Sequence, residues 1–346
     1  MEQSPERLRL PDQVIQLPRF ELPFPSDISP ITESVIEHTT WWAQATGLVP
    51  DEQAAERLRR NGVMHAGPRL VPAAPAGAAF LVCDWTVFLI VIDDEFDDGR
   101  ELGRRPDLAE AAIEDVVDSL RGRDRGLPCR FPQLDGIGVA VADLARRVEA
   151  MSPSQEWLPR FMRHAEDHLW SKVLEARQRA SDAMLDVPSY VDLRRITSAA
   201  YTYAGLVELA EQVVIPAPVQ DSPAWGLMLD AFADVWLGIQ DICSCAKEVA
   251  AGDELNLAAV MARGAGAGLE AIQRGVDDAY RWVSRRSGDF EQHQARLAEV
   301  PGQLGLDGAA ASDIARYLDS LKRLLGGHLT WNSKDNPRYS QVISSI

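Results

Sequence analysis

The segment VIDDEFDDG, residues 91–99, places five carboxylates within six positions, directly after a long run of mostly apolar residues. If residues 75–98 form one helix, Asp93 and Asp97 lie on the same face one turn apart, with Asp94 to one side. Like charges this close repel each other and oppose the dipole at the C-terminal end of a helix. A solvated acidic surface is the simple alternative, but the apolar run predicts a buried helix with these carboxylates at its edge. We therefore expect the cluster to bind a cation.

The identity of the cation follows from the ligands that each ion requires. An EF-hand calcium loop starting at Asp94 would have Phe96 at its third position and Arg105 at its twelfth, where oxygen ligands are needed. Mg²⁺ fits better, because one or two carboxylates usually hold it while water and substrate phosphate oxygens complete the coordination. The sequence therefore predicts a magnesium site in preference to a calcium loop.

A second segment, WLGIQDICSCAKEVAAGDELN at residues 236–256, carries polar groups at regular spacing. Gln240, Ser244 and Glu248 recur every four residues, so on a helix their oxygen atoms form one stripe, and Lys247 falls within about 20° of its start. A polar stripe on a surface helix is the alternative, but large apolar residues occupy the neighbouring positions. Buried polar groups need partners. A metal ion together with a phosphate would satisfy all four side chains.

The two segments together resemble a known family. DDEFDD is followed 147 residues later by QDICSCAKE (240 − 93 = 147), which is similar to the aspartate-rich motif and the N-D-x-x-S-x-x-K-E motif of bacterial class I terpene synthases. The resemblance extends over nearly the whole chain. The family carries an arginine 46 residues before the second motif, and Arg194 stands at that position (240 − 46 = 194). It also carries an Arg-Tyr pair near the C-terminus, where this chain has Arg338 and Tyr339.

The resemblance implies a reaction. The family ionises an allylic isoprenoid diphosphate with Mg²⁺ and cyclises the carbocation, so the chain would be a terpene cyclase, a carbon–oxygen lyase that releases diphosphate. The ligands expected for three magnesium ions are Asp93, Asp94, Asp97, Gln240, Ser244 and Glu248. The residues expected to act on the diphosphate and the breaking bond are Arg194, Ser198, Lys247, Arg338 and Tyr339. Two of these positions depart from the family. Gln240 replaces the usual asparagine, and Ser198 replaces a common glycine but still offers its backbone carbonyl.

The carbocation left by ionisation must be folded and shielded in an apolar cavity with aromatic faces. The candidate lining residues are Phe80, Trp85, Phe88, Leu89, Ile90, Tyr201, Tyr203, Trp236 and Trp331. Each aromatic residue has a simpler alternative role as part of the hydrophobic core. Where members with shorter substrates often have bulky aromatics, this chain has Leu89 and Ile90, and the small Ser198 faces the same cavity. We therefore favour geranylgeranyl diphosphate, the C20 precursor of diterpenes, over farnesyl diphosphate as the substrate.

The elements that must position these residues are helices. From Thr32 onward apolar residues recur at spacings of three and four, and strand-like alternation is hard to find. The predicted helical segments lie near residues 32–48, 75–98, 107–122, 137–150, 155–182, 188–214, 222–250, 266–286 and 309–331. Residues 1–30 are rich in proline and predict an extended surface arm. Residues 31–346 are expected to form one all-α domain, which by the resemblance is a helical bundle around a central active-site cavity.

The composition limits the partners. The formal net charge is −17, from 35 Lys and Arg against 52 Asp and Glu, so nucleic acid and anionic membrane surfaces should repel the chain. The N-terminal residues lack the apolar core of a secretory signal. Asp84 interrupts the apolar segment that most resembles a membrane span, so we expect a soluble, cytoplasmic protein. The four cysteines are expected to be reduced and buried. The family often forms homodimers, but no exposed stripe in the sequence decides the oligomeric state.

Three other interpretations stay open. A prenyl chain-elongating transferase shares the fold and the magnesium chemistry, but that family has a second DDxxD motif where this chain has QDICSCAKE. A non-enzymatic helical interaction protein would explain the acidic cluster, but not the Gln240 to Glu248 stripe or the pair Arg338 and Tyr339. A cyclase fold that has lost its activity would have Gln240 as its lesion.

Overall fold

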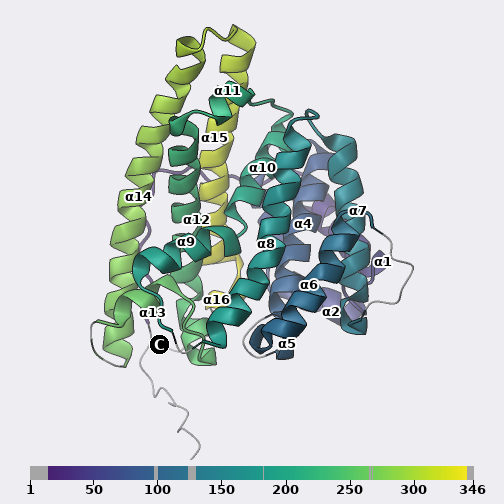
Figure 1. Cartoon of the computed structure of the whole chain (residues 1–346), viewed down its shortest axis with the longest axis vertical. Coiled ribbons are helices and arrows are strands. Elements are labelled where there is room, and N and C mark those ends of the chain that lie inside the picture. Colours follow the sequence, from purple (N-terminus) through teal and green to yellow (C-terminus); the bar gives the residue numbers. More distant parts are fainter. Residues whose placement is uncertain are drawn as a thin grey trace, which may run out of the picture.

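The computed structural model describes residues 15–96, 100–123, 130–181, 183–264, 266 and 268–340. Within these residues the regular structure is entirely helical, as Figure 1 shows, so the prediction of a single all-α domain is confirmed. The α-helices are α1 (Thr32–Ala45), α2 (Glu52–Arg60), α3 (Ala66–Leu70), α4 (Ala76–Glu95), α5 (Glu101–Arg104), α6 (Pro106–Leu120), α7 (Asp135–Met151), α8 (Trp157–Arg179), α9 (Val187–Thr197), α10 (Ala200–Glu211), α11 (Ala217–Gln220), α12 (Pro223–Ala251), α13 (Leu257–Ala262), α14 (Leu269–Gln303), α15 (Gly308–Thr330) and α16 (Pro337–Ser340). Shorter turns are the 3₁₀ segments η1 (Val63–His65) and η2 (Pro132–Leu134) and the π-helical segment η3 (Trp331–Asp335).

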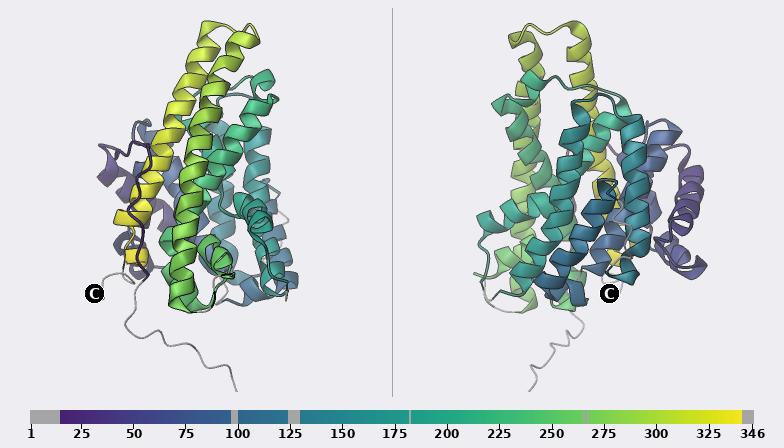
Figure 2. Two further views of the ribbon diagram at one scale, coloured as in Figure 1. Left: turned by 90° about the vertical axis from the view of Figure 1, so that its left-hand side faces the viewer. Right: turned by 45° about the vertical axis from the view of Figure 1, so that its right-hand side comes forward.

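The long helices form a bundle in which α10 joins two groups. One group is built on α4, which packs against α1, α3 and α7, while α8 packs against α6 and α9. The other group is built on α12, which packs against α14, α13 and α15. Helix α10 contacts α4 and α8 on one side and α12 and α15 on the other. As Figure 2 shows, α14 and α15 extend beyond the other helices at one end of the molecule.

Helix α4 lies in the centre of the first group because nearly all of its surface is apolar. By length and composition it could cross a membrane, but 67% of its most apolar window is buried inside the bundle. Asp84, in the middle of this helix, is fully buried and accepts hydrogen bonds from Thr39 of α1 (2.7 Å) and Arg147 of α7 (2.7 Å). His38 of α1 also contacts it, at 3.0 Å. Asp84 therefore ties α1 and α7 to α4.

The C-terminal end of α4 corrects one sequence prediction. The helix was expected to continue to residue 98, but it ends at Glu95, and Phe96 has left the helical conformation with φ −108° and ψ 10°. Several carboxylates at this end would face the negative end of the helix dipole and repel one another, which explains the early stop. Asp97 lies outside the described residues, so its expected place on the Asp93 face stays a prediction.

A second correction concerns the segment 188–214, which was expected to be one helix. It is divided into α9 and α10, because Ser198 ends the first helix and Ala199 adopts a left-handed conformation with φ 59°. Left-handed backbone costs a residue with a Cβ roughly 1–2 kcal/mol. The surrounding structure therefore holds Ala199 in a strained conformation at this break.

Residues 15–31, before α1, contain no helix in the structure and lie along α14 and α15 (Figure 2). Phe24 packs edge-on against Phe290 of α14, with ring centroids 5.9 Å apart. Asp27 forms an ion pair with Arg323 of α15 at 2.7 Å. The segment approaches α15 closely at Gly326, where an added Cβ would lie 2.0 Å from the carbonyl oxygen of Pro25.

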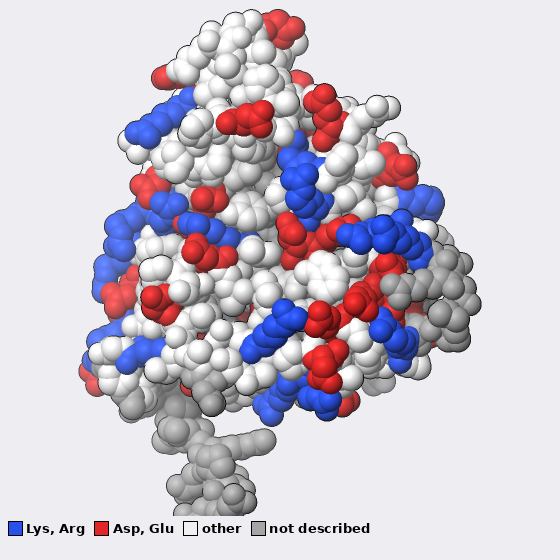
Figure 3. Space-filling view, in the orientation of Figure 1, with Lys and Arg blue, Asp and Glu red and all other residues white. Residues whose placement is uncertain are grey.

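The charged side chains on the face in Figure 3 are intermixed, with acidic and basic groups side by side. Ion pairs near the surface include Arg121 with Glu166 (2.5 Å) and Arg105 with Asp107 (2.8 Å). Exposed pairs of this kind contribute little to stability. Asp234 differs, because it is buried and binds both Arg195 and Arg286 (2.6 Å), which joins α9, α12 and α14.

Candidate active site

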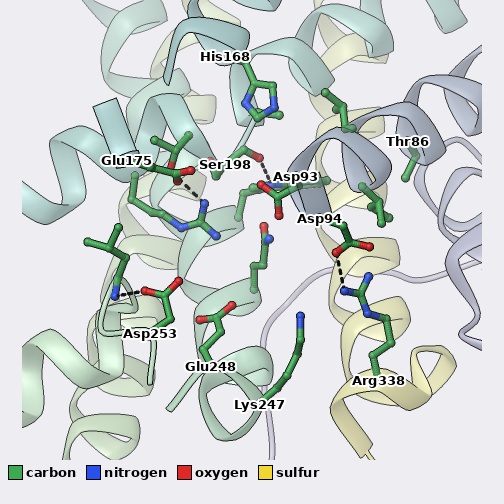
Figure 4. A pocket seen from close by; sticks show the side chains of 18 of the residues that line it. Thr86, Asp93, Asp94, His168, Glu175, Ser198, Lys247, Glu248, Asp253 and Arg338 are labelled. Carbon is green, nitrogen blue, oxygen red and sulfur yellow. Dashed lines mark hydrogen bonds and ion pairs between the residues drawn. The ribbon is translucent and has the colours of Figure 1, made fainter. Parts of the chain in front are cut away.

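A cavity of about 660 Å³ lies in the bundle where α4, α8, α9, α12 and α16 meet. Figure 4 shows one part of it, where Asp93 and Asp94 from α4 and Lys247 and Glu248 from α12 project toward the same space. The two motifs are 147 residues apart in the sequence (240 − 93). The fold brings them together because α10 joins the group of α4 to the group of α12.

The carboxylates at the end of α4 are paired with cations from other helices. Lys172 of α8 forms a short ion pair with Oδ1 of Asp93. Arg338 of α16 donates to Oδ1 of Asp94 at 2.9 Å (Figure 4). Burial alone would raise the pKa of Asp93, but the Lys172 ammonium outweighs burial and holds that pKa well below its usual range. Asp93 therefore stays ionised.

The stripe on α12 is divided between the cavity and the helix interface. Gln240, Lys247 and Glu248 line the cavity, as expected. Ser244 is fully buried and is not among the lining residues. Its hydroxyl has no hydrogen-bond partner of good geometry, although it lies close enough to Glu248 to favour the ionised carboxylate. A buried hydroxyl without a partner is uncommon, so this group has capacity for a ligand.

Glu248 is held by a residue that the sequence analysis did not single out. The side-chain amide of Asn256 donates to Oε2 of Glu248 (2.8 Å) and to the carbonyl oxygen of Asp241 (2.7 Å). Its own oxygen accepts from the backbone amide of Ala258 (2.9 Å) and so caps α13. Burial, with the nearby Asp241 carboxylate, raises the pKa of Glu248 to about 7. The carboxyl therefore lacks a nearby cation strong enough to offset its burial.

Arg194 lines the cavity from α9 and is fixed by Asp241, the second residue of the QDICSCAKE motif. The Nε atom of Arg194 donates to Asp241 Oδ1 at 3.0 Å. Asp241 Oδ2 accepts from the hydroxyl of Tyr190 (2.6 Å) and from the backbone amide of Leu257 (3.0 Å). Asp241 is 1% exposed and absent from the cavity lining, so it acts on the site through Arg194. The motif contained this signal, but we assigned no role to its aspartate.

The apolar wall of the cavity contains Leu89, Ile90, Tyr203, Trp236 and Trp331, all of which were expected there. The rings of Tyr203 and Trp236 lie 4.6 Å apart. Arg338 and Tyr339 also line the cavity, so the C-terminal pair reaches the site from α16.

Ser198 lines the cavity at the break between α9 and α10, as expected. Its backbone carbonyl accepts a hydrogen bond from Nε1 of Trp236 at 3.0 Å. Trp236 also stacks on His328 with ring centroids 3.5 Å apart. The indole therefore orients the Ser198 carbonyl, which keeps a second lone pair available.

Four expected aromatic residues do not line the cavity: Phe80, Trp85, Phe88 and Tyr201. Phe80 stacks on His38 at 4.3 Å, and Trp85 packs edge-on against Phe88 at 6.2 Å within the core. The hydroxyl of Tyr201 donates to Asp230 at 2.9 Å, beside a separate small pocket. Helix α4 is buried on nearly every side, so its apolar pattern does not indicate which face meets the cavity.

Helix α8 carries a polar stripe that we did not predict, which comprises His168, Lys172, Glu175 and Arg179. These residues are spaced by four, three and four positions and so share one helix face, and three of them line the cavity, Lys172 being the exception. Burial and the Lys172 ammonium lower the pKa of His168 to about 4, so its ring is neutral near pH 7. The ring nitrogen Nε2 of His168 is buried without a partner. Because α8 also carries charged residues such as Arg163 and Asp167 outside this stripe, the sequence alone did not distinguish the stripe from a solvent-exposed face.

The donor set suits a hard divalent cation, because it offers carboxylate, amide and hydroxyl oxygens. Among the described residues no group of three His, Cys, Asp or Glu side chains converges in metal-binding geometry. Asp93 and Asp94 instead contact Lys172 and Arg338. The uncompensated Glu248 carboxyl nevertheless fits a metal that approaches from the cavity, and the unpartnered Ser244 hydroxyl lies beside this carboxyl, behind the cavity lining.

Comparisons with known proteins agree with this geometry. Residues 84–284 match the model of the family described as terpene synthase family 2, C-terminal metal binding. The chain is 28% identical over 331 residues to a (+)-eremophilene synthase of Sorangium cellulosum, covering 94% of each protein. It is 26% identical to a 7-epi-alpha-eudesmol synthase ((2E,6E)-farnesyl diphosphate cyclizing) of Streptomyces viridochromogenes, covering 90% of this chain and 89% of that one. The solved structure of a hedycaryol synthase has the same fold, with a TM-score of 0.78 at 22% identity over 93% of this chain and 99% of that one.

Proposed function

Because the chain belongs to terpene synthase family 2 and is a class I terpene synthase, we propose that it cyclises farnesyl diphosphate to a sesquiterpene with Mg²⁺ as its cofactor. One observation carries the proposal. Asp93 and Asp94 face Gln240 and Glu248 across one cavity. Apolar residues such as Leu89 line another part of the same cavity. A polar end that can hold a metal and a diphosphate thus opens onto an apolar space that can hold a hydrocarbon.

The metal would be held by oxygen atoms from both helices. We assign Asp93 and Asp94 of α4, with Asp97 beyond the described residues, and Gln240, Ser244 and Glu248 of α12, and we expect three ions. When bound, magnesium would neutralise the charge that develops on the leaving diphosphate. The amide oxygen of Gln240 can replace that of asparagine on a side chain one methylene longer.

The cations of the chain would bind the diphosphate itself. Arg194, Lys247 and Arg338 line the cavity, and Tyr339 adds a hydroxyl. Asp241 fixes the orientation of Arg194, so this guanidinium meets the diphosphate without first losing side-chain entropy. Arg338 has to exchange Asp94 for the diphosphate, since it forms an ion pair with Asp94 in the free protein.

The apolar wall would protect the carbocation from water. The ring faces of Tyr203 and Trp236 attract positive charge, and Leu89 and Ile90 offer no nucleophile. The free lone pair of the Ser198 carbonyl can stabilise positive charge near the bond that breaks. The neutral ring of His328, whose pKa burial lowers to about 3, adds no positive charge that would repel the cation.

The preference for geranylgeranyl diphosphate, inferred from Leu89 and Ile90, has no support among the relatives. Their names are largely those of sesquiterpene synthases, and one of them names farnesyl diphosphate. The physical reason is that the lining of the cavity also includes large rings from other helices, among them Trp236, His328 and Trp331. These rings occupy space that the small residues on α4 leave open. Farnesyl diphosphate is therefore the proposed substrate.

A product assay tests the proposal. The protein is incubated with Mg²⁺ and, separately, with geranyl, farnesyl and geranylgeranyl diphosphate, and the organic extracts are analysed by gas chromatography and mass spectrometry. We expect a cyclic C15 hydrocarbon or alcohol from farnesyl diphosphate. A product from geranylgeranyl diphosphate alone would overturn the substrate assignment. No product from any of the three, with the protein folded, would favour the inactive cyclase with Gln240 as its lesion.

A further inference from the structure

Lys172 is a charged residue beside the site that has no role in the proposed reaction. It lies in α8 with its side chain 1% exposed, and it is not among the residues that line the cavity. Its ammonium contacts Oδ1 of Asp93 and lies 3.3 Å from Oε2 of Glu175. A buried ammonium is stable only with such partners. Lys172 therefore reaches Asp93 from outside the cavity wall.

The remaining surface of Asp93 faces the cavity. Its side chain is 50% exposed although Lys172 is enclosed, and Asp93 belongs to the cavity lining. Among the described residues no hydrogen-bond donor reaches its second oxygen, Oδ2. One oxygen of this carboxylate is thus neutralised by the protein, while the other is open to a ligand from the cavity.

The free protein therefore supplies its own cations to the acidic end of α4. Lys172 neutralises Asp93, and Arg338 neutralises Asp94. A divalent ion that binds Asp93 comes close to the Lys172 ammonium, and the two cations repel each other inside a partly desolvated site. Lys172 cannot move far, because it is enclosed and Glu175 is the other carboxylate that it contacts.

We propose that Lys172 is a built-in counter-cation of Asp93, which raises the Mg²⁺ concentration needed to fill the site so that metal binds firmly only together with diphosphate. This inference rests on the proposed function. Diphosphate brings negative charge and draws Arg338 away from Asp94, and both changes favour the metal. Mg²⁺ alone gains neither advantage and has to overcome Lys172.

The test is isothermal titration calorimetry of the full chain with Mg²⁺, in the absence and presence of inorganic diphosphate. Wild type should bind Mg²⁺ weakly alone and much more tightly with diphosphate. In Lys172→Met the Mg²⁺ concentration for half-saturation should fall roughly tenfold, because the repelling charge next to Asp93 is gone. An unchanged or higher concentration in Lys172→Met would overturn the inference.

The matched control is Arg147→Met, which also removes a cation from a carboxylate of α4. Arg147 contacts Asp84 at 2.7 Å, and neither residue lines the cavity. This variant should lose thermal stability but keep the wild-type Mg²⁺ dependence. A tenfold shift in Arg147→Met as well would show a general charge effect and would also overturn the inference.

Two further measurements distinguish a variant that does not fold from a Lys172 that has no effect on Mg²⁺ binding. If Lys172→Met does not fold, the double variant Lys172→Met/Glu175→Gln restores the local charge balance and should still bind Mg²⁺ at least about threefold more tightly than wild type. Wild-type affinity in the double variant would overturn the role of Lys172. If wild type itself binds no Mg²⁺ with diphosphate, the proposed function fails as well; binding by wild type with no effect of Lys172→Met refutes the inference alone.

Discussion

Asp84 and Asp93 lie on the same helix, and each is paired with a cation from a neighbouring helix, but their surroundings differ. Asp84 is fully buried, and both of its oxygens accept hydrogen bonds, from Thr39 and Arg147. Asp93 has one oxygen on Lys172, and its side chain is half exposed to the cavity. The first carboxylate is fully used by the fold, whereas the second keeps capacity for a ligand.

An ion pair alone therefore does not distinguish a structural aspartate from a functional one. The distinction lies in the hydrogen-bonding capacity that remains and in whether it faces a cavity. Glu248 meets the same criterion as Asp93. It lines the cavity, and its pKa of about 7 shows that the protein does not fully compensate its charge.

The largest effect on activity is expected at Asp93, whose carboxylate has one oxygen free for a ligand. Asp93→Asn should lower product formation by on the order of a thousandfold, because a metal that stabilises the leaving group loses an anionic ligand. The fold should persist, since Lys172 keeps Glu175 as its partner. Gas chromatography measures the rate and circular dichroism the helicity. Turnover within tenfold of wild type would contradict the assignment.

Asp84, whose two oxygens are both hydrogen-bonded within the fold, should affect stability and not activity. Asp84→Asn should lower the free energy of unfolding by about 2 kcal/mol or more, because it breaks a buried ion pair and leaves the partly buried Arg147 with the more distant carboxylate of Asp143 (3.4 Å). The folded fraction should keep its turnover number. Urea denaturation gives the stability, and Asp107→Asn, in an exposed pair with Arg105, is the control that should change it by less than about 0.5 kcal/mol. Equal losses in both variants would refute the structural role of Asp84.

A smaller effect is expected at Glu248, with a defined pH dependence. Its pKa in the folded protein, about 7, exceeds the ordinary value of 4.5, so the folded state holds this proton more tightly than the unfolded state. The resulting stability is present below pH 4.5 and is lost as the pH rises through 7. Glu248→Gln should therefore stabilise the metal-free protein by roughly 1–3 kcal/mol at pH 8 and by almost nothing at pH 4.

Thermal denaturation in the presence of a chelator measures this difference, and the same variant should lose its activity. The loss of activity with a gain of stability would identify Glu248 as a group kept for function. A stability gain of the same size at pH 4 and pH 8 would mean that charge burial at Glu248 is not its cause.

The smallest effect is expected at the break between α9 and α10. Ala199→Gly should raise the free energy of unfolding by about 0.5–1 kcal/mol, because glycine adopts a positive φ without strain. Gln212, the other described non-glycine residue with positive φ, provides the control, since it ends α10 outside the cavity. Gln212→Gly also relieves strain but loses the hydrogen bonds that the Gln212 amide donates to the carbonyl oxygens of Met151 (3.1 Å) and Leu209 (2.7 Å), so its stability should gain less. Ala199→Gly alone should change the product ratio. An identical product mixture from both variants would show that the backbone at Ala199 does not shape the part of the cavity that determines the product.

The sequence predicted the features that depend on local pattern and on motifs. The apolar run predicted the buried helix α4, and the spacing of Gln240, Ser244 and Glu248 predicted one polar stripe on α12. The resemblance then indicated that Asp93 and Gln240 meet, and both line one cavity. The family and its enzyme class are confirmed by the match over residues 84–284.

The features that were missed depend on contacts between distant segments. A helix buried on all sides carries no pattern that indicates a particular face, so Phe80 and Trp85 were misplaced. The pairing of Lys172 with Asp93 joins residues 79 positions apart, and no local rule indicates it. The strain at Ala199 depends on the packing around the break, which the propensity of alanine for helix concealed.

A crystal structure of the protein with Mg²⁺ and inorganic diphosphate tests most directly whether the residues of α4 and α12 hold metal and diphosphate in one site. We predict metal on Asp93 and Glu248, the diphosphate on Arg194, Lys247 and Arg338, and the ion pair between Arg338 and Asp94 broken. Diphosphate bound elsewhere, or an Asp93 carboxylate without metal in the presence of bound diphosphate, would contradict this assignment of the site.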